Sequence, residues 1–368
     1  MTILARRLEV LHYRNYESYA LDLSEGVTVL VGKNAQGKTN LVEALQLLTS
    51  GASFRKPSPL ELVAGGDGAC RLDLSLEGEG RVLDLGLDVR DGRRSFRKNG
   101  KKCTASGVRG VLPSVLFCPD HLDMVKRSAG VRRQALDGFG IQLNEQYANL
   151  VASYERIVEQ RNSLLKERYC TRDLLAAWNE SLASTGAALL VHRLALLDRL
   201  RKYVTETYEA VSDGETIGMS YQSSIGGEEI WVGSADMRSA ITERFLAALD
   251  EVADDELRRG ITLVGPHRDE IVFEVDGRPA RAFASQGQQR TLVLAWKVAE
   301  VAVTRDILGR YPLLLLDDVM SELDADRRTA FLGFVGRDIQ TVITTTNLGY
   351  FSDDVLRRAK VVKIGANG

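Results

Sequence analysis

The segment VTVLVGKNAQGKT, residues 27–39, decides the fold of this chain. Its first part, Val27–Val31, is a β-branched run that predicts a short buried strand, and a glycine-rich loop follows it. Apolar residues then recur at helical spacing between positions 41 and 48. The order strand, glycine loop, helix predicts an α/β protein that holds a phosphate group at a helix N-terminus.

The loop satisfies the pattern G-x-x-x-x-G-K-[ST]. Its glycines allow backbone N–H groups to turn inward on phosphate oxygens, Lys38 supplies positive charge to the β- and γ-phosphates, and the Thr39 hydroxyl can ligate Mg²⁺. We therefore expect ATP and Mg²⁺ as cofactors. The expected ATP-binding residues of the loop are Gly32, Lys33, Asn34, Ala35, Gln36, Gly37, Lys38 and Thr39.

A second apolar run ends on two acids. Leu313–Leu316 predicts a buried parallel strand, and Asp317 and Asp318 follow it directly. A phosphate loop needs a carboxylate at the end of a neighbouring strand to hold the metal and its water shell. Because paired buried carboxylates cost free energy unless a cation or proton compensates, we assign Asp317 to Mg²⁺ and Asp318 to polarising the attacking water. The alternative is a pair of capping residues at the strand end.

The rest of the chain changes character twice. Strand patterns fill the N-terminal part, and the dipeptides Asp91-Gly92 and Asn99-Gly100 predict hairpin turns. Helical rhythms between 131 and 212 predict two long helices packed as an antiparallel pair. The first of these should bury Tyr147, Leu150, Tyr154, Ile157 and Leu164. Strands are then expected at 261–264, 271–275 and 341–346, and a helix at 287–308.

The two ends of the chain thus share one α/β character. We expect an ATPase core made of residues 1–120 and 260–368, with a helical lobe, residues 121–259, inserted between its halves. The net charge of −2 gives no global attraction to nucleic acid, so any DNA contact requires a local patch. No long apolar run or signal peptide is evident, and the four cysteines lie far apart, which predicts a cytoplasmic protein with reduced thiols and no membrane partner.

The segment Ser285–Arg290, SQGQQR, opens the predicted helix at 287–308. Ser285 would cap that helix, and Gly287 would allow a close backbone approach. This is a second phosphate-binding helix terminus, far along the chain from the first. Since one nucleotide rarely needs both from the same subunit, we expect two copies of the chain to complete the ATP site.

Taken in order, these motifs resemble the ABC-type ATPase head, in which the signature and phosphate loop of opposite protomers sandwich ATP. Within that class, four segments closely resemble the RecF family of recombination and repair proteins: 32–45, 265–269, 283–291 and 317–324. The resemblance covers nearly the whole chain, from residue 8 to residue 347. The order and spacing of the motifs, rather than any single one, make it specific.

The resemblance implies roles for further residues. Arg14 and Asn15 match a family segment near the adenine and phosphates. The signature residues that contact the γ-phosphate of the partner's ATP are Ser285, Gly287 and Gln288, and the D-loop residues that line the dimer seam are Ser321 and Asp324. Within 265–269, His267 and Arg268 either serve a family function or satisfy local backbone and carboxylate groups.

The resemblance also implies a function. The family forms an ATP-dependent homodimer that binds single- and double-stranded DNA at gaps or junctions, with RecR and RecO as partners and RecA as an indirect one, in DNA repair, replication and the SOS response. Transporter-type ABC proteins usually have Glu where Asp318 stands and His near Thr346. The shorter carboxylate and the missing imidazole suggest a slow, DNA-stimulated ATPase that acts as a switch.

Basic residues crowd the predicted hairpins between positions 90 and 102, where Asp91 is the only acid. Such side chains can neutralise DNA phosphates, although a charge run is also typical of a solvated sheet edge. The candidate DNA-binding residues are Arg93, Arg94, Arg97, Lys98, Lys101 and Lys102. A second candidate cluster contains Lys126, Arg127, Arg132 and Arg133.

Two other classes remain open. A chromosome-organising ATPase head of the SMC type would need a coiled coil of hundreds of residues, whereas the helical insert here spans under about 100. A transporter motor subunit would couple to membrane helices, and DNA-stimulated ATP hydrolysis without a membrane partner would exclude it.

Overall fold

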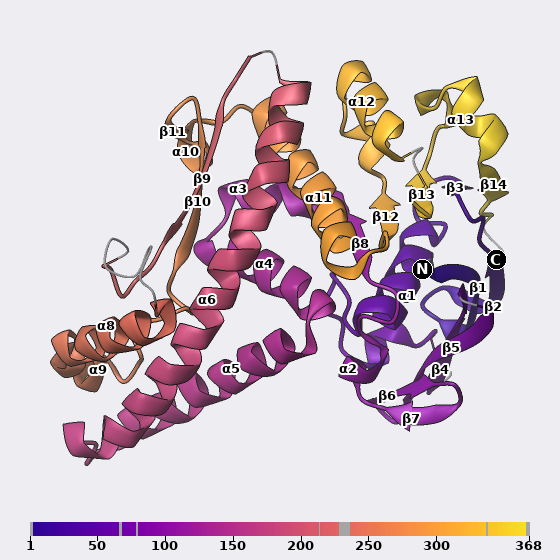
Figure 1. The fold of residues 1–368 in the computed structure, drawn as a ribbon. Coiled ribbons are helices and arrows are strands. Elements are labelled where there is room, and N and C mark those ends of the chain that lie inside the picture. The colour runs from indigo at the N-terminus through magenta and orange to yellow at the C-terminus, as the bar shows by residue number, and fades with distance from the viewer. Residues whose placement is uncertain are drawn as a thin grey trace. The chain divides into compact units, whose positions relative to one another are not determined.

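The computed structural model describes residues 3–65, 68–78, 80–212, 214–227, 236–335 and 338–365 (Figure 1). The chain forms two compact units. Unit 1 comprises Met1–Leu122 and Arg290–Gly368, so it is built from both ends of the chain. Unit 2 comprises Asp123–Gln289.

Unit 1 contains an antiparallel sheet in the order β2-β1-β4-β5-β6-β7. Its strands are β1 Ile3–Tyr13, β2 Tyr16–Asp22, β4 Ala69–Gly78, β5 Arg81–Arg90, β6 Arg93–Lys98 and β7 Lys101–Cys103. Both predicted hairpin turns are confirmed, because Asp91-Gly92 and Asn99-Gly100 have positive φ at both residues, as a two-residue type I′ turn requires.

A parallel sheet in the order β14-β3-β13-β12-β8 forms the other layer of unit 1. Its strands are β3 Val27–Val31, β8 Ser114–Phe117, β12 Leu313–Asp317, β13 Thr341–Thr345 and β14 Lys360–Lys363. The predicted strands at 27–31, 313–316 and 341–346 are therefore confirmed. The first four residues of β12, Leu313–Leu316, form an unbroken apolar run, as expected of a strand that is buried on both faces.

Helix α1, Lys38–Ser50, packs between the two sheets. Most of its residues are buried, and the apolar ones join side chains of both sheets in one core. Other helices of unit 1 are short: α2 Ala105–Val108, η1 Leu60–Leu62, η2 Pro119–Leu122, η3 Val319–Ser321, α12 Ala325–Val335, η4 Leu348–Tyr350 and α13 Asp353–Arg358. Helix α11, Gln286–Leu308, begins in unit 2 and continues into unit 1, and it confirms the predicted helix.

Unit 2 is mainly helical. Its helices are α3 Asp123–Lys126, α4 Ala129–Leu143, α5 Glu145–Leu165, α6 Arg172–Val211, α8 Met237–Glu251, α9 Ala253–Arg259 and α10 Ala280–Phe283. α5 and α6 lie side by side as the predicted pair (Figure 1). α6 is long and apolar enough to cross a membrane by those two criteria alone, but core helices pass the same test, and its apolar residues join the core of unit 2.

The buried stripe of α5 differs from the predicted one. Tyr147 and Tyr154 are buried as expected, whereas Leu150, Ile157 and Leu164 are only half-buried. Arg161 occupies a buried place on the stripe, with its guanidinium bonded to Glu256 and Thr262 at 2.5 and 2.8 Å. A buried arginine is tolerated because its charge is paired and its N–H groups are satisfied.

The predicted strand at 261–264 is wrong. The backbone there bonds to side chains instead of to a neighbouring strand: Thr262 N–H donates to Asn162, and Leu263 N–H donates to Glu256. Unit 2 contains a small sheet instead, β11-β10-β9, formed by β9 Ile217–Gln222, β10 Glu270–Val275 and β11 Arg278–Pro279. Because β10 pairs with β9, residues 260–289 group with unit 2, whereas the sequence placed them in the core.

Candidate functional site

Three segments meet at the carboxyl edge of the parallel sheet. β3, β13 and β12 are adjacent and parallel, with Val31 opposite Thr345 and Thr344 opposite Asp317. The glycine loop, the two predicted acids and the end of β13 therefore share one edge, which is where open α/β sheets bind ligands.

The loop at residues 32–39 depends on its glycines. Gly37 has φ +96°, and a Cβ there would lie 2.6 Å from the Asn15 amide nitrogen. A Cβ on Gly32 would lie 2.5 Å from the carbonyl oxygen of Ile364. Lys38 begins α1 and turns back over the loop, where its ammonium donates to the carbonyls of Gly32 and Lys33 at 2.7 and 2.8 Å. The loop is therefore a tight cradle that presents one buried cation.

Asp317 lies within reach of the end of this loop. Its Oδ1 accepts hydrogen bonds from the hydroxyls of Thr39, at 2.9 Å, and Thr344, at 2.8 Å. Burial raises the pKa of Asp317, whose exposed fraction is 5%. A hydroxyl and a carboxylate held together are oxygen donors of the kind that Mg²⁺ binds. The predicted metal pair is thus brought together, and Thr344 orients it.

Asp318 adopts a left-handed backbone conformation with φ 54° at the start of η3. Burial raises its pKa, while the nearby Lys38 ammonium acts in the opposite direction. Its backbone N–H donates to the Thr344 hydroxyl, and its carbonyl accepts from Ser321. Asp324 caps α12 by accepting from the N–H of Arg327, so both predicted D-loop residues shape the turn after β12.

Arg14 is held by a carboxylate of α1. Its Nε and Nη2 donate to the two oxygens of buried Glu43 at 3.0 and 2.8 Å, and its Nη1 donates to the Glu61 carbonyl. Asn15 lies against the loop, where its amide reaches the Gln36 carbonyl and its oxygen accepts from Asn40. Asn15 therefore borders the phosphate loop directly, whereas Arg14 braces the helix that follows it.

Ser285 and Gln288 form a capping box at the start of α11. The Ser285 Oγ accepts from the N–H of Gln288 at 3.2 Å, and Gln288 Oε1 accepts from the N–H of Ser285 at 2.7 Å. Ser285 is exposed and Gly287 half-buried, so this terminus of unit 2 faces solvent. The N-terminus of a helix carries partial positive charge, which favours an anion nearby.

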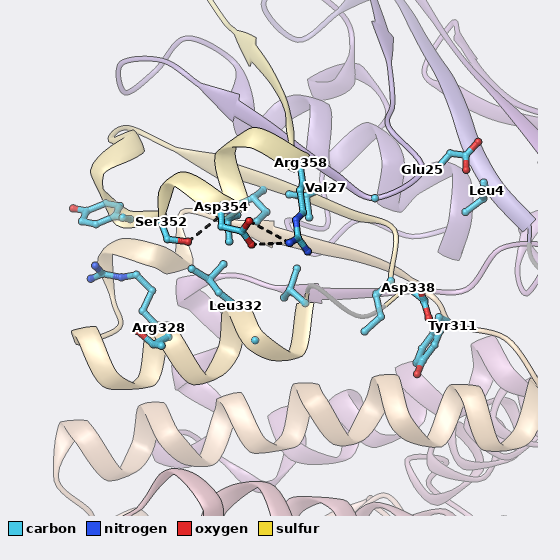
Figure 2. Close-up of a pocket in the computed structure, with 18 of the residues that line it drawn as sticks. Leu4, Glu25, Val27, Tyr311, Arg328, Leu332, Asp338, Ser352, Asp354 and Arg358 are labelled. Carbon is cyan, nitrogen blue, oxygen red and sulfur yellow. Dashed lines mark hydrogen bonds and ion pairs between the residues drawn. The ribbon is translucent and has the colours of Figure 1, made fainter.

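A cleft of about 1150 Å³ opens elsewhere on unit 1 (Figure 2). Side chains of α12 and α13, among them Leu332 and Arg358, line it together with Val27, the first residue of β3. None of the described loop residues 32–39 contributes to it. Because ligands of parallel sheets bind beyond the carboxyl ends of strands, this cleft is not the phosphate site.

Comparisons with known proteins agree with this geometry. The family model described as the RecF/RecN/SMC N terminal domain matches residues 4–364. The chain is 38% identical to the DNA replication and repair protein RecF of Synechocystis sp., over 98% of this chain and 96% of that protein. The chain belongs to the RecF family.

Among solved structures, this chain is more similar to RecF than to an Smc head. A structure of the recombination mediator protein RecF with ATP, in the RecFOR pathway, has a TM-score of 0.88 and 29% identity, and the match covers 100% of this chain and 98% of that one. An Smc head bound to the C-winged helix domain of ScpA has a TM-score of 0.57 and 16% identity over 98% and 93%, so it shares the fold alone. The predicted ABC-type ATPase head is confirmed, and membership of a family of DNA replication and repair proteins is supported over the SMC-type alternative.

The RecF-like segment at 265–269 is anchored within unit 2. His267 Nε2 lies 3.2 Å from the Thr262 carbonyl, and Arg268 donates to the same carbonyl. Burial lowers the pKa of His267 to about 4, so the ring is neutral at physiological pH. These contacts favour the local structural interpretation of His267 and Arg268.

The predicted DNA residues do not form one uniform patch. Arg97 lies on the sheet face, paired with Asp88 at 2.5 Å and Asp73 at 2.9 Å, and Arg94 donates to a backbone carbonyl. Lys98 is half-buried. Arg93, Lys101 and Lys102 are exposed and form no ion pair within the described part of the chain.

The second basic cluster, at 126–133, contains both exposed and buried side chains. Arg132 is buried, and its guanidinium makes two hydrogen bonds of 2.7 Å to Glu270. Arg127 pairs with Asp123 on the same helical turn, and Arg133 donates to a backbone carbonyl. Buried Arg132 is therefore not available to DNA, whereas DNA contact by the exposed Lys126 and Arg127 stays a prediction.

Sequence reasoning missed the residues that hold the site in shape. Thr344 was within a predicted strand, but its role depends on the register of β13 against β12. Glu43 and Glu215 carry no motif: the first is a buried carboxylate on α1 that binds Arg14, and the second contacts Gln288. Only their tertiary contacts reveal them.

Proposed function

We propose that this chain is an ATP-dependent DNA clamp of recombinational repair and replication-fork maintenance, acting in the cytoplasm. Two copies close around bound ATP, and the dimer grips DNA at gaps or single/double-strand junctions. RecR and RecO are its partners, through which it helps to load RecA. Membership of the RecF family and the likeness to the ATP-bound RecF of the RecFOR pathway support this proposal.

The nucleotide is held at the loop Gly32–Thr39, with Arg14 and Asn15 beside it, and Mg²⁺ is held by Thr39 and Asp317. The fit rests on the two glycines that admit no Cβ, the buried Lys38 ammonium and the oxygen donors beside it. Mg²⁺ keeps water and phosphate oxygens as ligands and, when bound, neutralises charge on the β- and γ-phosphates.

The observation that carries the dimer proposal is the exposed terminus of α11. It offers a capping box already assembled and the Ser285 side chain in solvent. A second copy supplies this terminus to the γ-phosphate, using Ser285, Gly287 and Gln288. Ser321 and Asp324 line the seam between the two copies.

Hydrolysis opens the clamp, and Asp318 polarises the attacking water. Its raised pKa favours a carboxyl that can take up a proton. The shorter Asp reaches less far than the Glu of transporter-type proteins, so we propose a slow ATPase, stimulated by DNA, that acts as a switch. DNA contacts come from the exposed cations of the β5–β7 hairpins, Arg93, Lys101 and Lys102, with Lys98 beside them.

Sedimentation velocity with and without ATP tests the proposal. We expect Lys38→Met and Asp317→Ala to remain monomeric with ATP and Mg²⁺, whereas the unaltered chain dimerises. Lys202→Met is the matched control, since it removes an exposed cation of α6, and it should dimerise normally. Undiminished ATP-dependent dimerisation of Lys38→Met would count decisively against the clamp.

A further inference from the structure

The side-chain amide of Gln288 forms hydrogen bonds through both its oxygen and its nitrogen. Its Oε1 accepts from the N–H of Ser285 inside the capping box, and its Nε2 donates to Glu215 Oε1 at 2.8 Å. A glutamate in this place would close the box equally well, but it would have no proton to donate and would face Glu215 with like charge. The glutamine is therefore matched to the carboxylate beside it.

Glu215 also reaches the long helix of unit 2. Its Oε2 accepts from the Tyr208 hydroxyl at 2.8 Å, and Tyr208 is buried on α6, one turn before that helix ends. Ser212, just beyond the helix, donates to the Glu215 carbonyl at 3.3 Å. One half-buried carboxylate thus bridges the last turn of α6 and the first turn of α11.

The charge of Glu215 suits this place. A carboxylate near a helix N-terminus is favourable because the unpaired N–H groups there carry partial positive charge. Two donors, one from each helix, orient its oxygens. The carboxylate thereby fixes the rotamer of Gln288 without occupying the N–H groups that an incoming phosphate needs.

We propose that Glu215 is a positioning residue for the partner-facing terminus of α11: it holds Gln288, through Gln288 the Ser285 cap, and it links both to α6. This inference rests on the proposed function, because it states how the terminus is kept in shape for the ATP of a second copy. Glu215 itself does not touch the nucleotide. A displacement of the last turn of α6 is transmitted to the signature through this carboxylate.

The first test compares three variants for ATP-dependent dimerisation. Glu215→Ala should raise the dimer dissociation constant about tenfold, as for loss of a charge-assisted hydrogen bond, and leave the ATP affinity of the monomer unchanged. Glu215→Gln should restore dimerisation, since its amide can accept from Gln288 and donate to Tyr208. Glu209→Ala is the matched control, because it removes an exposed carboxylate from the end of α6. An unimpaired Glu215→Ala dimer would overturn the inference.

A double-mutant cycle asks whether the two side chains act through each other. In a Gln288→Ala background, Glu215→Ala should raise the dimer dissociation constant less than about twofold, because the contact between the two side chains is already absent. The same tenfold cost in that background would overturn the proposal.

Hydrogen exchange without ATP separates this inference from the proposed function. The amide of Gln288 should exchange faster in Glu215→Ala than in the Glu209→Ala control, since the cap that protects it loosens. Equal protection would refute the positioning role even if dimerisation changed. Failure of the unaltered chain to dimerise with ATP would instead refute the clamp and leave the exchange result standing.

Discussion

The buried carboxylate of Asp317 lowers the free energy of unfolding of the chain when it is ionised. Burial raises its pKa above the ordinary value. A folded pKa above the unfolded one means that folding disfavours the ionised form, so at neutral pH ionised Asp317 destabilises the folded chain. The neighbouring Asp318 carboxylate acts in the same direction. Such a group is retained for what its charge binds rather than for stability.

Replacing Asp317 by Asn should therefore stabilise the nucleotide-free chain by on the order of 1 kcal/mol, because the amide oxygen still accepts from Thr39 and Thr344 while the charge is gone. Urea unfolding at pH 7 measures the difference. The stability gained by the substitution should shrink as the pH falls below the pKa of Asp317 in the folded state. It should vanish below the pKa of the unfolded state, because the carboxyl is then protonated in both states. A destabilised Asp317→Asn would show that the carboxylate is structurally paired, and Mg²⁺-dependent ATP binding should be lost in either case.

At the scale of elements, the β6–β7 hairpin carries two kinds of basic side chain: some are paired with acids of the sheet, and others are exposed and can contact DNA. Side chains alternate between the faces of a strand, so neighbouring basic residues have different surroundings. Arg97 crosses the sheet face above Gly86 and pairs with two acids, whereas Lys101 and Lys102 lie exposed on the edge strand. A basic run read from the sequence therefore overstates the number of charges that DNA can meet.

Reversing the charge of both Lys101 and Lys102 to Glu should weaken DNA binding at least about tenfold and reduce the slope of log affinity against log salt by about 2, one for each phosphate contact. The paired substitutions Lys360→Glu and Lys363→Glu on β14 make the same charge change on an exposed edge of the other sheet, and DNA binding should survive them. Fluorescence anisotropy across a salt series compares the two. An identical salt slope in both double variants would exclude the hairpin as a DNA contact.

At the scale of the whole molecule, the phosphate loop lies in unit 1 and the signature terminus in unit 2. The proposed clamp requires each ATP to meet the loop of one copy and the terminus of the other. A symmetric dimer then holds the same pair of contacts twice. Two variants that each lack a different half of the site should therefore complement each other, which a site within one chain would not allow.

Mixing two inactive variants should restore hydrolysis. Lys38→Met lacks a working loop and Ser285→Arg a working terminus, so their mixed dimer retains one complete site between the intact loop and the intact terminus. Equal mixing should recover up to about half of the original ATPase activity, because each mixed dimer has one complete site of two. Steady-state phosphate release measures this. Recovery that never exceeds the sum of the separate variants would place loop and terminus of one site in the same chain.

The sequence by itself determined the elements that local chemistry dictates. The run Val27–Val31, the loop glycines and Lys38 predict strand, turn and helix, because steric limits at Gly37 and the period of apolar residues are local properties. The order of strand-ending acids and helix caps was enough to indicate an ABC-type head. The hairpin turns at residues 91–92 and 99–100 follow from the same local rules.

Tertiary structure alone decided which polar groups meet. Residues 261–264 were expected to form a strand, but their backbone bonds to side chains such as Glu256, and the same carboxylate pairs with buried Arg161. Likewise, only the structure shows that Arg97 is paired with Asp73 and Asp88, whereas other basic residues of the hairpins are exposed. The physical reason is that desolvation and pairing of polar groups depend on side chains distant in the chain, whose positions no local pattern encodes.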